Sequence, residues 1–362
     1  MKMKTSPMLL GLTAALLCGA QLVSAQEKPN EKYRPKLFAM FGDNLHVLDG
    51  LTQHKNGDIY MSVPNYIDKR YAPVIMKRTA KGEWSIFVQA LLNEKTGRAG
   101  PMGIELGPDG NLYYCDNQYF FDKDYQSRIM RVVIGANGQP VRIEPVIERI
   151  KLANAIRFYK NELIFSDTQS DLPNVNHGAV YRVPMSAFKE KPVQLLNKDQ
   201  MEKDPYFLGK TDTVLLPVRN DNSGADGVCL DKDGNIYTGT FGDAHFYTMK
   251  RNADGTYGKP ELLFYDPKVW PCCDGICYYA KKNWIIMTDS AMNAVRYWDI
   301  DAKKLGLIWQ NGDTDGADGL LDQPCEPMVW KGKLLIVNFD WTFPGLMNTS
   351  NDKANTISVI DL

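Results

Sequence analysis

The chain has 362 residues, of which 44% are hydrophobic, and this is enough to bury a large core. Its 42 lysine and arginine residues nearly balance 43 aspartate and glutamate residues. The basic residues form no cluster, which argues against nucleic acid or an anionic membrane surface as the main partner. Charged residues make up 23% of the chain and aromatic residues 11%, which excludes a disordered chain and a coiled coil.

The N-terminal segment has the pattern of a secretory signal peptide. Two lysine residues precede an apolar run over residues 8–23, and the small residues Ser24 and Ala25 follow it. Glycine and polar residues interrupt the run, which disfavours the alternative of a retained membrane anchor, and no later stretch has the ~20 apolar residues of a spanning helix. We therefore predict a signal peptide over residues 1–25 and a mature protein over residues 26–362 in the periplasm or outside the cell.

A pattern of a polar residue, a small residue, an apolar run, a tight turn and a second apolar run recurs along the chain. One copy is Asp226-Gly227-Val228, followed by a turn over residues 232–235 and then Ile236. Six copies succeed one another at intervals of roughly fifty residues, a length typical of propeller blades. The first residue of each copy, called the anchor below, is in chain order Asp49, Met102, Asn154, Asp226, Asp274 and Glu326.

Six anchors predict an all-β fold, a six-bladed β-propeller with four strands in each blade. The interval after the third anchor is longer, because residues 186–209 form an insertion that has room for a short helix. The last copy supplies three strands, and residues 36–40 near the N-terminus supply a fourth. Since pairing the two chain ends in one blade removes exposed strand edges, we predict that this N-terminal strand closes the last blade of a single domain over residues 26–362.

The anchors predict a metal site. Each lies where the innermost strand of a blade begins, so closure of the ring brings them together at one end of the axis. Four anchors carry carboxylates and Asn154 carries an amide, and carboxylates crowded on an axis repel one another and lose hydration. A hard divalent cation relieves this repulsion, and calcium accepts six to eight oxygen ligands in irregular geometry. The alternative is that these side chains only cap the strand starts.

The loops on the anchor face predict a pocket for a small cyclic molecule. They are rich in aromatic residues, Tyr119 and Trp341 among them, which suit a sugar ring, although such residues also pack against one another in loop cores. His177 and His245 lie in the same loops and are candidate proton carriers. With the anchor Met102, these residues form the predicted substrate-binding set.

The acidic loop over residues 313–318 also lies on the anchor face. We interpret it as a solvated turn, with a second cation site as the alternative.

The six cysteines that follow the signal peptide form no Cys-x-x-Cys pair, so structural zinc and attached haem are not expected. A disulfide that joins Cys272 or Cys273 to Cys325 stays open as an alternative to free thiols.

The stretches over residues 49–60 and 224–237 resemble the senescence marker protein/gluconolactonase family of six-bladed propellers, which includes sugar lactonases. The resemblance implies one divalent cation, usually calcium, held by the anchors of the first, third, fourth and fifth blades. The ligands would be Asp49, Asn154, Asp226 and Asp274, with Glu326 as an additional carboxylate. The chain departs from the family pattern, which has Glu at the position of Asp49 and Asn at the position of Asp226.

The resemblance further implies hydrolysis of a sugar lactone or a similar cyclic ester. The cation would act as a Lewis acid on the carbonyl group, and Asp274, or Asp226 as second choice, would take a proton from the attacking water. One alternative is a non-catalytic periplasmic propeller that binds a carbohydrate or a protein, and another is a lyase or epimerase acting on a carbohydrate derivative. The sequence motifs of serine hydrolases, zinc peptidases and Rossmann folds are absent.

Overall fold

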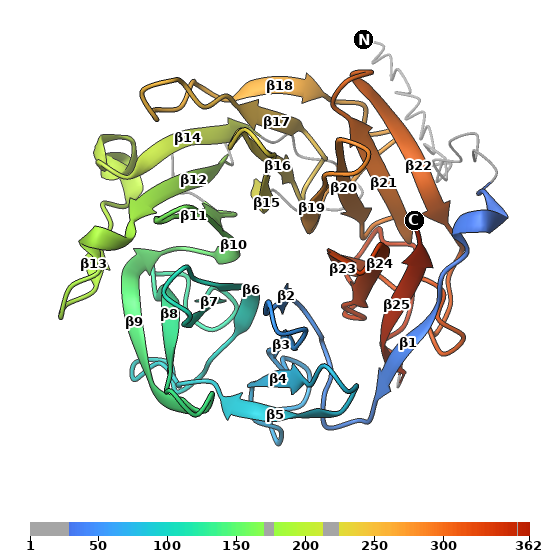
Figure 1. The fold of residues 1–362 in the computed structure, drawn as a ribbon, viewed down its shortest axis with the longest axis horizontal. Coiled ribbons are helices and arrows are strands. Elements are labelled where there is room, and N and C mark those ends of the chain that lie inside the picture. The colour runs from blue at the N-terminus through green and yellow to red at the C-terminus, as the bar shows by residue number, and fades with distance from the viewer. Residues whose placement is uncertain (1–28, 170–176, 213–223, 353) are drawn as a thin grey trace, which may run out of the picture.

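The apolar runs on either side of each tight turn form neighbouring strands, and six antiparallel sheets built in this way surround a central axis (Figure 1). The computed structural model describes residues 29–169, 177–212, 224–352 and 354–362. The predicted signal peptide lies outside these residues. Each sheet has its innermost strand at the axis, and the predicted six-bladed β-propeller is confirmed.

The first three blades follow the chain from the axis outward. The first blade comprises β2 (Leu51–Gln53), β3 (Ile59–Val63), β4 (Val74–Arg78) and β5 (Trp84–Gln89). The second comprises β6 (Pro101–Leu106), β7 (Leu112–Asp116), β8 (Ser127–Ile134) and β9 (Pro140–Ile150). The third comprises β10 (Ala153–Tyr159), β11 (Glu162–Asp167), β12 (His177–Pro184) and β14 (Phe207–Asp212).

The remaining blades repeat the arrangement. The fourth comprises β15 (Ala225–Leu230), β16 (Ile236–Thr240), β17 (Phe246–Met249) and β18 (Glu261–Phe264). The fifth comprises β19 (Ile276–Tyr279), β20 (Trp284–Asp289), β21 (Ala294–Asp299) and β22 (Lys304–Gln310). The sixth comprises β23 (Pro324–Trp330), β24 (Lys333–Asn338), β25 (Asn355–Asp361) and the N-terminal β1 (Lys36–Phe41).

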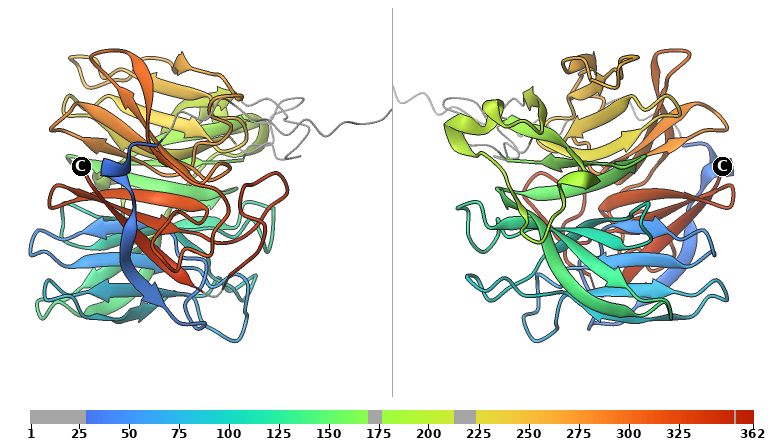
Figure 2. Two further views of the ribbon diagram at one scale, coloured as in Figure 1. Left: turned by 90° about the vertical axis from the view of Figure 1, so that its right-hand side faces the viewer. Right: turned by 60° about the vertical axis from the view of Figure 1, so that its left-hand side comes forward.

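The N-terminal strand closes the ring, as predicted. β1 pairs antiparallel with β25, with Phe41 opposite Asn355 and Lys36 opposite Val359. In Figure 2, β1 runs along the outer edge of the last blade beside β25. The first and last segments of the fold are therefore hydrogen-bonded to each other, which ties the last blade to the start of the first.

The insertion between the third and fourth anchors adds an edge strand to a neighbouring blade. It contains the 3₁₀ turns η2 (Met185–Ala187) and η3 (Lys198–Lys203), with β13 (Val193–Gln194) between them. β13 pairs in parallel with β9, so the second sheet has five strands. A third 3₁₀ turn, η1 (Glu31–Tyr33), precedes β1. The helix expected in the insertion takes this 3₁₀ form.

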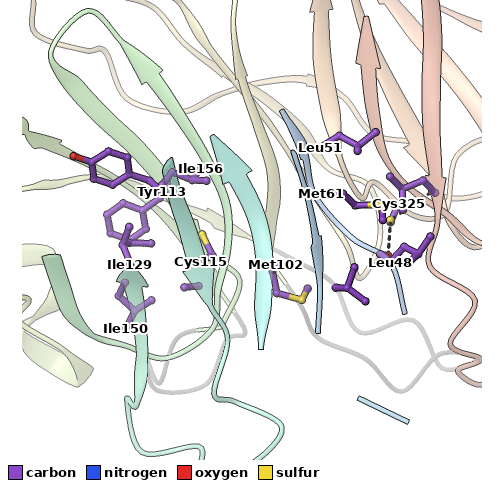
Figure 3. Packing of buried hydrophobic residues seen from close by; sticks show 14 of the residues in the cluster. Leu48, Leu51, Met61, Met102, Tyr113, Cys115, Ile129, Ile150, Ile156 and Cys325 are labelled. Atoms are coloured by element: carbon purple, nitrogen blue, oxygen red, sulfur yellow. Dashed lines mark hydrogen bonds between the residues drawn. The ribbon is translucent and has the colours of Figure 1, made fainter. Parts of the chain in front are cut away.

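Buried aliphatic and aromatic side chains fill the spaces between blades. In the cluster drawn in Figure 3, Leu48, Met61 and Cys325 pack together at the junction of the first and last blades. The Cys325 thiol lies 3.5 Å from the Leu48 carbonyl oxygen, which it meets as a weak donor. Each fully buried side chain of this size contributes roughly 1.5–3 kcal/mol to stability. The junction of the first and last blades, where the ring closes, is therefore stabilised by an apolar core.

All six cysteines of the described residues are free thiols, including Cys272, Cys273 and Cys325, so the structure contains no disulfide at these positions. None of the helices in the described part of the chain is long and apolar enough to cross a membrane.

Candidate functional site at the hub of the propeller

The anchors sit where the pairing of the innermost strands is irregular. Between Pro101 and Ile104 the register of the second blade shifts, and the third, fourth and sixth blades shift at the equivalent place. An irregularity of this kind turns side chains away from the direction that a regular ladder gives them. The anchors of these four blades, Met102, Asn154, Asp226 and Glu326, lie within the shifted segments.

A hydroxyl group on the second strand of a blade holds the anchor segments of adjacent blades together. The Ser62 hydroxyl accepts a hydrogen bond from the Gly50 N–H (2.8 Å) and lies 2.5 Å from the Met102 carbonyl oxygen, to which it donates. In the third blade, the Ser166 hydroxyl accepts a hydrogen bond from the Ala155 N–H (3.0 Å) and donates one to the Asp226 carbonyl oxygen of the fourth blade (2.6 Å). These bonds fix the backbone of neighbouring anchors relative to each other.

The glycine that follows most anchors is required by close approach of adjacent inner strands. A Cβ atom built on Gly227 would lie 2.3 Å from the Asp274 carbonyl oxygen, and one built on Gly103 would lie 2.4 Å from the Asn154 carbonyl oxygen. No side chain fits at such distances. In the recurring Asp-Gly pair, the aspartate therefore places a carboxylate at the hub, and the glycine allows the inner strand of the next blade to approach closely.

Anchor carboxylates from different blades influence one another. Asp49 is only 7% exposed, and its pKa is raised well above the ordinary value by burial and then by the charges of Asp274 and Glu326. Asp226 shares this environment, because it and Asp274 add to the effect of burial in raising the pKa of the Cys273 thiol. Asn154 is half-buried in the same ring of anchors. The hub thus collects oxygen-bearing side chains.

A buried arginine lies among these acids. Arg157 of β10 forms an ion pair with Glu326 of β23, and its guanidinium also donates to the Ile276 carbonyl oxygen at 3.2 Å. The Glu105 carboxylate lies 3.9 Å from its Nε atom. Burial alone would lower the pKa of Arg157, but Glu326 and Glu105 raise it overall. The protein therefore supplies one positive charge to the hub from its own sequence.

Glu326 keeps a raised pKa in spite of this partner. Burial raises the pKa of its carboxyl group to about 7, and the pairing with Arg157 opposes the shift.

The repeat contains a signal that would have located Arg157. Glu105, Arg157, Cys229 and Cys277 all stand three residues after an anchor. The structure brings them together, because Glu105 lies 3.9 Å from Arg157 and the charges of Cys277 and Arg157 act on the Cys229 thiol. The Thr52 hydroxyl, at the same offset, donates to Glu105 at 2.8 Å. The charged residues at this offset belong to the same site as the anchors, because Arg157 pairs with Glu326 and lies beside Glu105.

Asp274, the first candidate base, has a neighbouring hydroxyl group. The Ser290 Oγ atom lies 2.6 Å from Asp274 Oδ2 and 2.7 Å from the Pro324 carbonyl oxygen. Ser290 is fully buried. The single proton of the hydroxyl group is available to either acceptor, and when Ser290 donates to Asp274 it restricts the rotation of the carboxylate.

Aromatic rings border the hub beside Asp49. The Tyr66 ring lies 5.2 Å from the rings of both Phe120 and Trp341, and Tyr119 lies 6.1 Å from Phe120. Burial raises the pKa of Tyr66 well above its ordinary value, and the charge of Asp49 adds to the effect. Phe120 is 43% exposed. The predicted wall residues Tyr119 and Trp341 thus belong to one aromatic group with a face open to solvent.

The other predicted substrate-binding residues occupy different surroundings. Met102 is 7% exposed and belongs to the hydrophobic cluster between blades. The His245 Nδ1 atom lies 2.9 Å from Asp243 Oδ1, and its ring stacks on Tyr265 at 3.7 Å, all within the fourth blade. The backbone of His177 pairs with Asp212 at the start of β12, but its side chain lies outside the described residues.

A second group of carboxylates lies in the connections of the sixth blade. One oxygen atom from each of Asp322, Asp340 and Asp352 lies within 4.8 Å of the others, an arrangement that can hold a metal ion. Burial and then Asp340 raise the pKa of Asp322 to about 9, and burial raises the pKa of Asp340 to about 7. The sequence analysis did not identify this group, although it singled out the neighbouring acidic loop over residues 313–318.

Comparison with known proteins bears on the fold. No family model and no curated protein matches the sequence. Among solved structures, a gluconolactonase from Xanthomonas campestris is 14% identical, with a TM-score of 0.55 over 92% of this chain and 96% of that chain. A luciferin-regenerating enzyme is 12% identical, with a TM-score of 0.60 over 91% and 95% of the two chains.

A sugar-oxidising enzyme matches equally well. The PQQ-bound form of an aldose sugar dehydrogenase from Streptomyces coelicolor is 15% identical, with a TM-score of 0.58 over 92% of this chain and 98% of that chain. The likeness is one of fold. The resemblance to gluconolactonase-type propellers is thus confirmed as a shared architecture, and the chemistry of the hub has to be argued from the residues of this chain.

Proposed function

We propose that this protein is a metal-dependent hydrolase of a sugar lactone or a related cyclic ester, with its active site at the hub. One observation carries the proposal: Asp49 is buried among like charges, with Asp274 and Glu326 close enough to raise its pKa. Buried carboxylates that repel one another are stabilised by a shared cation. Residues 1–25, the predicted signal peptide, lie outside the described residues, and we propose export to the periplasm on their sequence pattern alone.

By the type of their donor atoms, the anchors suit a hard divalent cation, with calcium as first choice. Asp49, Asn154, Asp226 and Asp274 offer only oxygen ligands, which calcium prefers to nitrogen or sulfur. Glu326 is already paired with Arg157, and it is therefore the weaker candidate among the five anchors proposed as ligands. When bound, the cation supplies a Lewis acid that polarises a carbonyl group.

The general base and the substrate-binding surface are assigned to residues of this chain. We assign Asp274 as the base that takes a proton from the attacking water, with Asp226 as second choice, because the nearby Ser290 hydroxyl orients the Asp274 carboxylate. The aromatic group of Tyr66, Phe120 and Trp341 holds the sugar ring beside Asp49. The raised pKa of Asp49 supports an assignment as ligand, since its charge needs compensation.

The test is hydrolysis of a panel of sugar lactones by chelator-treated protein, before and after calcium is restored, with the spontaneous rate subtracted. We expect turnover that depends on the metal and is lost in Asp226→Ala and Asp274→Ala variants that retain the circular dichroism of the wild type. Asp109→Ala, in an exposed turn, is the matched control and should retain full activity. Full activity in the two hub variants or in the chelated protein would reject the mechanism.

The same panel separates the rival functions. Product analysis distinguishes hydrolysis from elimination or epimerisation. Oxidation of aldoses in the presence of PQQ is measured in parallel, because a sugar dehydrogenase shares the fold. If no lactone, aldose or carbohydrate derivative is converted but sugars still bind at the hub, the non-catalytic binding function is supported instead.

A further inference from the structure

The carboxylates of the sixth blade come from two connections: Asp322 lies in the one that leads into β23, and Asp340 and Asp352 lie at the two ends of the one that joins β24 to β25. Their oxygen atoms come within 4.8 Å of one another. Three carboxylate oxygens this close together offer the ligands that a hard divalent cation prefers.

The charge of Asp322 has no compensation within the described residues. Its side chain is 0% exposed, and neither of its carboxylate oxygens has a hydrogen-bond partner there. No ion pair of the described part of the chain includes Asp322, Asp340 or Asp352. A fully buried carboxylate without a donor is strongly unfavourable, so the position calls for a positive ligand.

A neutral side chain gives a second, independent indication. Asn348 is 2% exposed, and its Nδ2 atom donates to Asp340 Oδ1 at 3.2 Å. Its Oδ1 atom is buried without a partner. Because the amide group is bonded to Asp340, this oxygen lies at the edge of the carboxylate group. An unpartnered amide oxygen beside three carboxylates is a typical additional ligand for a hard cation.

We propose that Asp322, Asp340, Asp352 and the amide oxygen of Asn348 bind a divalent cation of the calcium class, separate from the cation proposed at the hub. The ion would join the connection that leads into β23 to both ends of the β24–β25 connection, in the blade that closes the ring. It would also fix the segment that begins at Asp340 and carries Trp341, whose backbone N–H donates to Gln323 Oε1 at 2.6 Å. The site therefore positions part of the aromatic wall without touching the substrate.

Equilibrium dialysis of chelator-stripped mature protein against radioactive calcium tests the proposal. Asp322→Asn and Asp340→Asn should each lower the stoichiometry by one ion, whereas the matched control Asp318→Asn, exposed in the adjacent loop, should leave it unchanged. Asp274→Asn removes a ligand of the hub instead. If the hub binds no ion, the wild type binds one ion and Asp322→Asn none, so failure of the hub proposal is distinguished from failure of this one.

The difference in melting temperature between Asp322→Asn and the wild type should change sign between chelator and excess calcium. In chelator, Asp322→Asn should melt above the wild type, because the variant lacks a carboxyl group that can be buried there only as an unpaired charge or by taking up a proton. In excess calcium the order should reverse, with the wild type raised by several degrees, roughly the effect of a ligand well above its dissociation constant. Unchanged calcium stoichiometry in Asp322→Asn, or a variant that melts below the wild type in both conditions, overturns the proposal.

Discussion

Arg157 and Glu326 form an ion pair between the inner strands of opposite blades, the third and the sixth. The side chain of Arg157 is 14% exposed and that of Glu326 is 9% exposed, so both charges are largely removed from water. The pair links two halves of the ring that share no strand pairing. It also means that part of the negative charge at the hub is balanced by the protein itself.

Arg157→Met should destabilise the protein by about 3–5 kcal/mol, the usual cost of removing one partner of a buried ion pair and leaving the other charge unpaired. The change leaves Glu326 and Glu105 without their counter-charge. Urea unfolding in the presence of chelator measures the effect. Arg142→Met is the control, because Arg142 also pairs with a glutamate but is 58% exposed, and its loss should cost under about 0.5 kcal/mol. Equal losses in both variants would contradict the structural role of the pair.

Gly227→Ala should disturb the fold and the hub together. The added Cβ would meet the Asp274 carbonyl oxygen at 2.3 Å, so the inner strands of the fourth and fifth blades must separate, at a cost of about 1–3 kcal/mol. Because Asp226 and Asp274 move apart, lactone hydrolysis should fall at least tenfold. Urea unfolding and the hydrolysis assay measure the two effects.

The control for this variant is Gly312→Ala, since a Cβ built on Gly312 meets no atom within 4 Å. It should alter neither stability nor activity, and a loss like that of Gly227→Ala would refute the packing argument.

Phe120→Ala should weaken substrate binding more than it slows the chemical step. Phe120 contacts Tyr66 and Trp341 but has no role in proton transfer, and its exposed face is available to a sugar ring. We expect a five- to tenfold rise in KM with kcat nearly unchanged, on the order of the value of one aromatic contact. Leu262→Ala, half exposed on the outer strand β18, should change neither constant. A fall in kcat alone would place Phe120 in another role.

The protein should lose stability through Asp167 as the pH rises. Burial raises the pKa of this carboxyl group to about 6, against an ordinary value of 3.8. The folded state therefore holds the proton more tightly than the unfolded chain does. The contribution is fully present below pH 4 and is lost as the pH rises through 6.

Comparison with Asp167→Asn isolates this effect. Between pH 4 and 7.5, the unfolding free energy of the wild type relative to the variant should fall by on the order of 2–3 kcal/mol. Urea unfolding at the two pH values gives the difference, and the same comparison with Asp301→Asn, an exposed residue, should show no such change. A difference that is independent of pH would exclude a raised pKa at Asp167.

The sequence predicted the fold because each blade is a local unit. The alternation of apolar strands and glycine turns within about fifty residues determines four strands that pair with their neighbours in sequence. The requirement that both chain ends be paired then placed β1 in the last blade. The aromatic composition of the loops likewise indicated the group of Tyr119 and Trp341, since all these loops share one face.

Only the tertiary structure decided which side chains meet. Arg157 and Glu326 belong to blades on opposite sides of the ring, and the carboxylates of Asp322, Asp340 and Asp352 come from two separate connections. β13 lies between two strands of the third blade in sequence but joins the edge of the second blade. Periodicity fixes the hydrogen bonds inside a blade, but contacts across the axis and between loops depend on how the closed ring sets its blades and side chains in space.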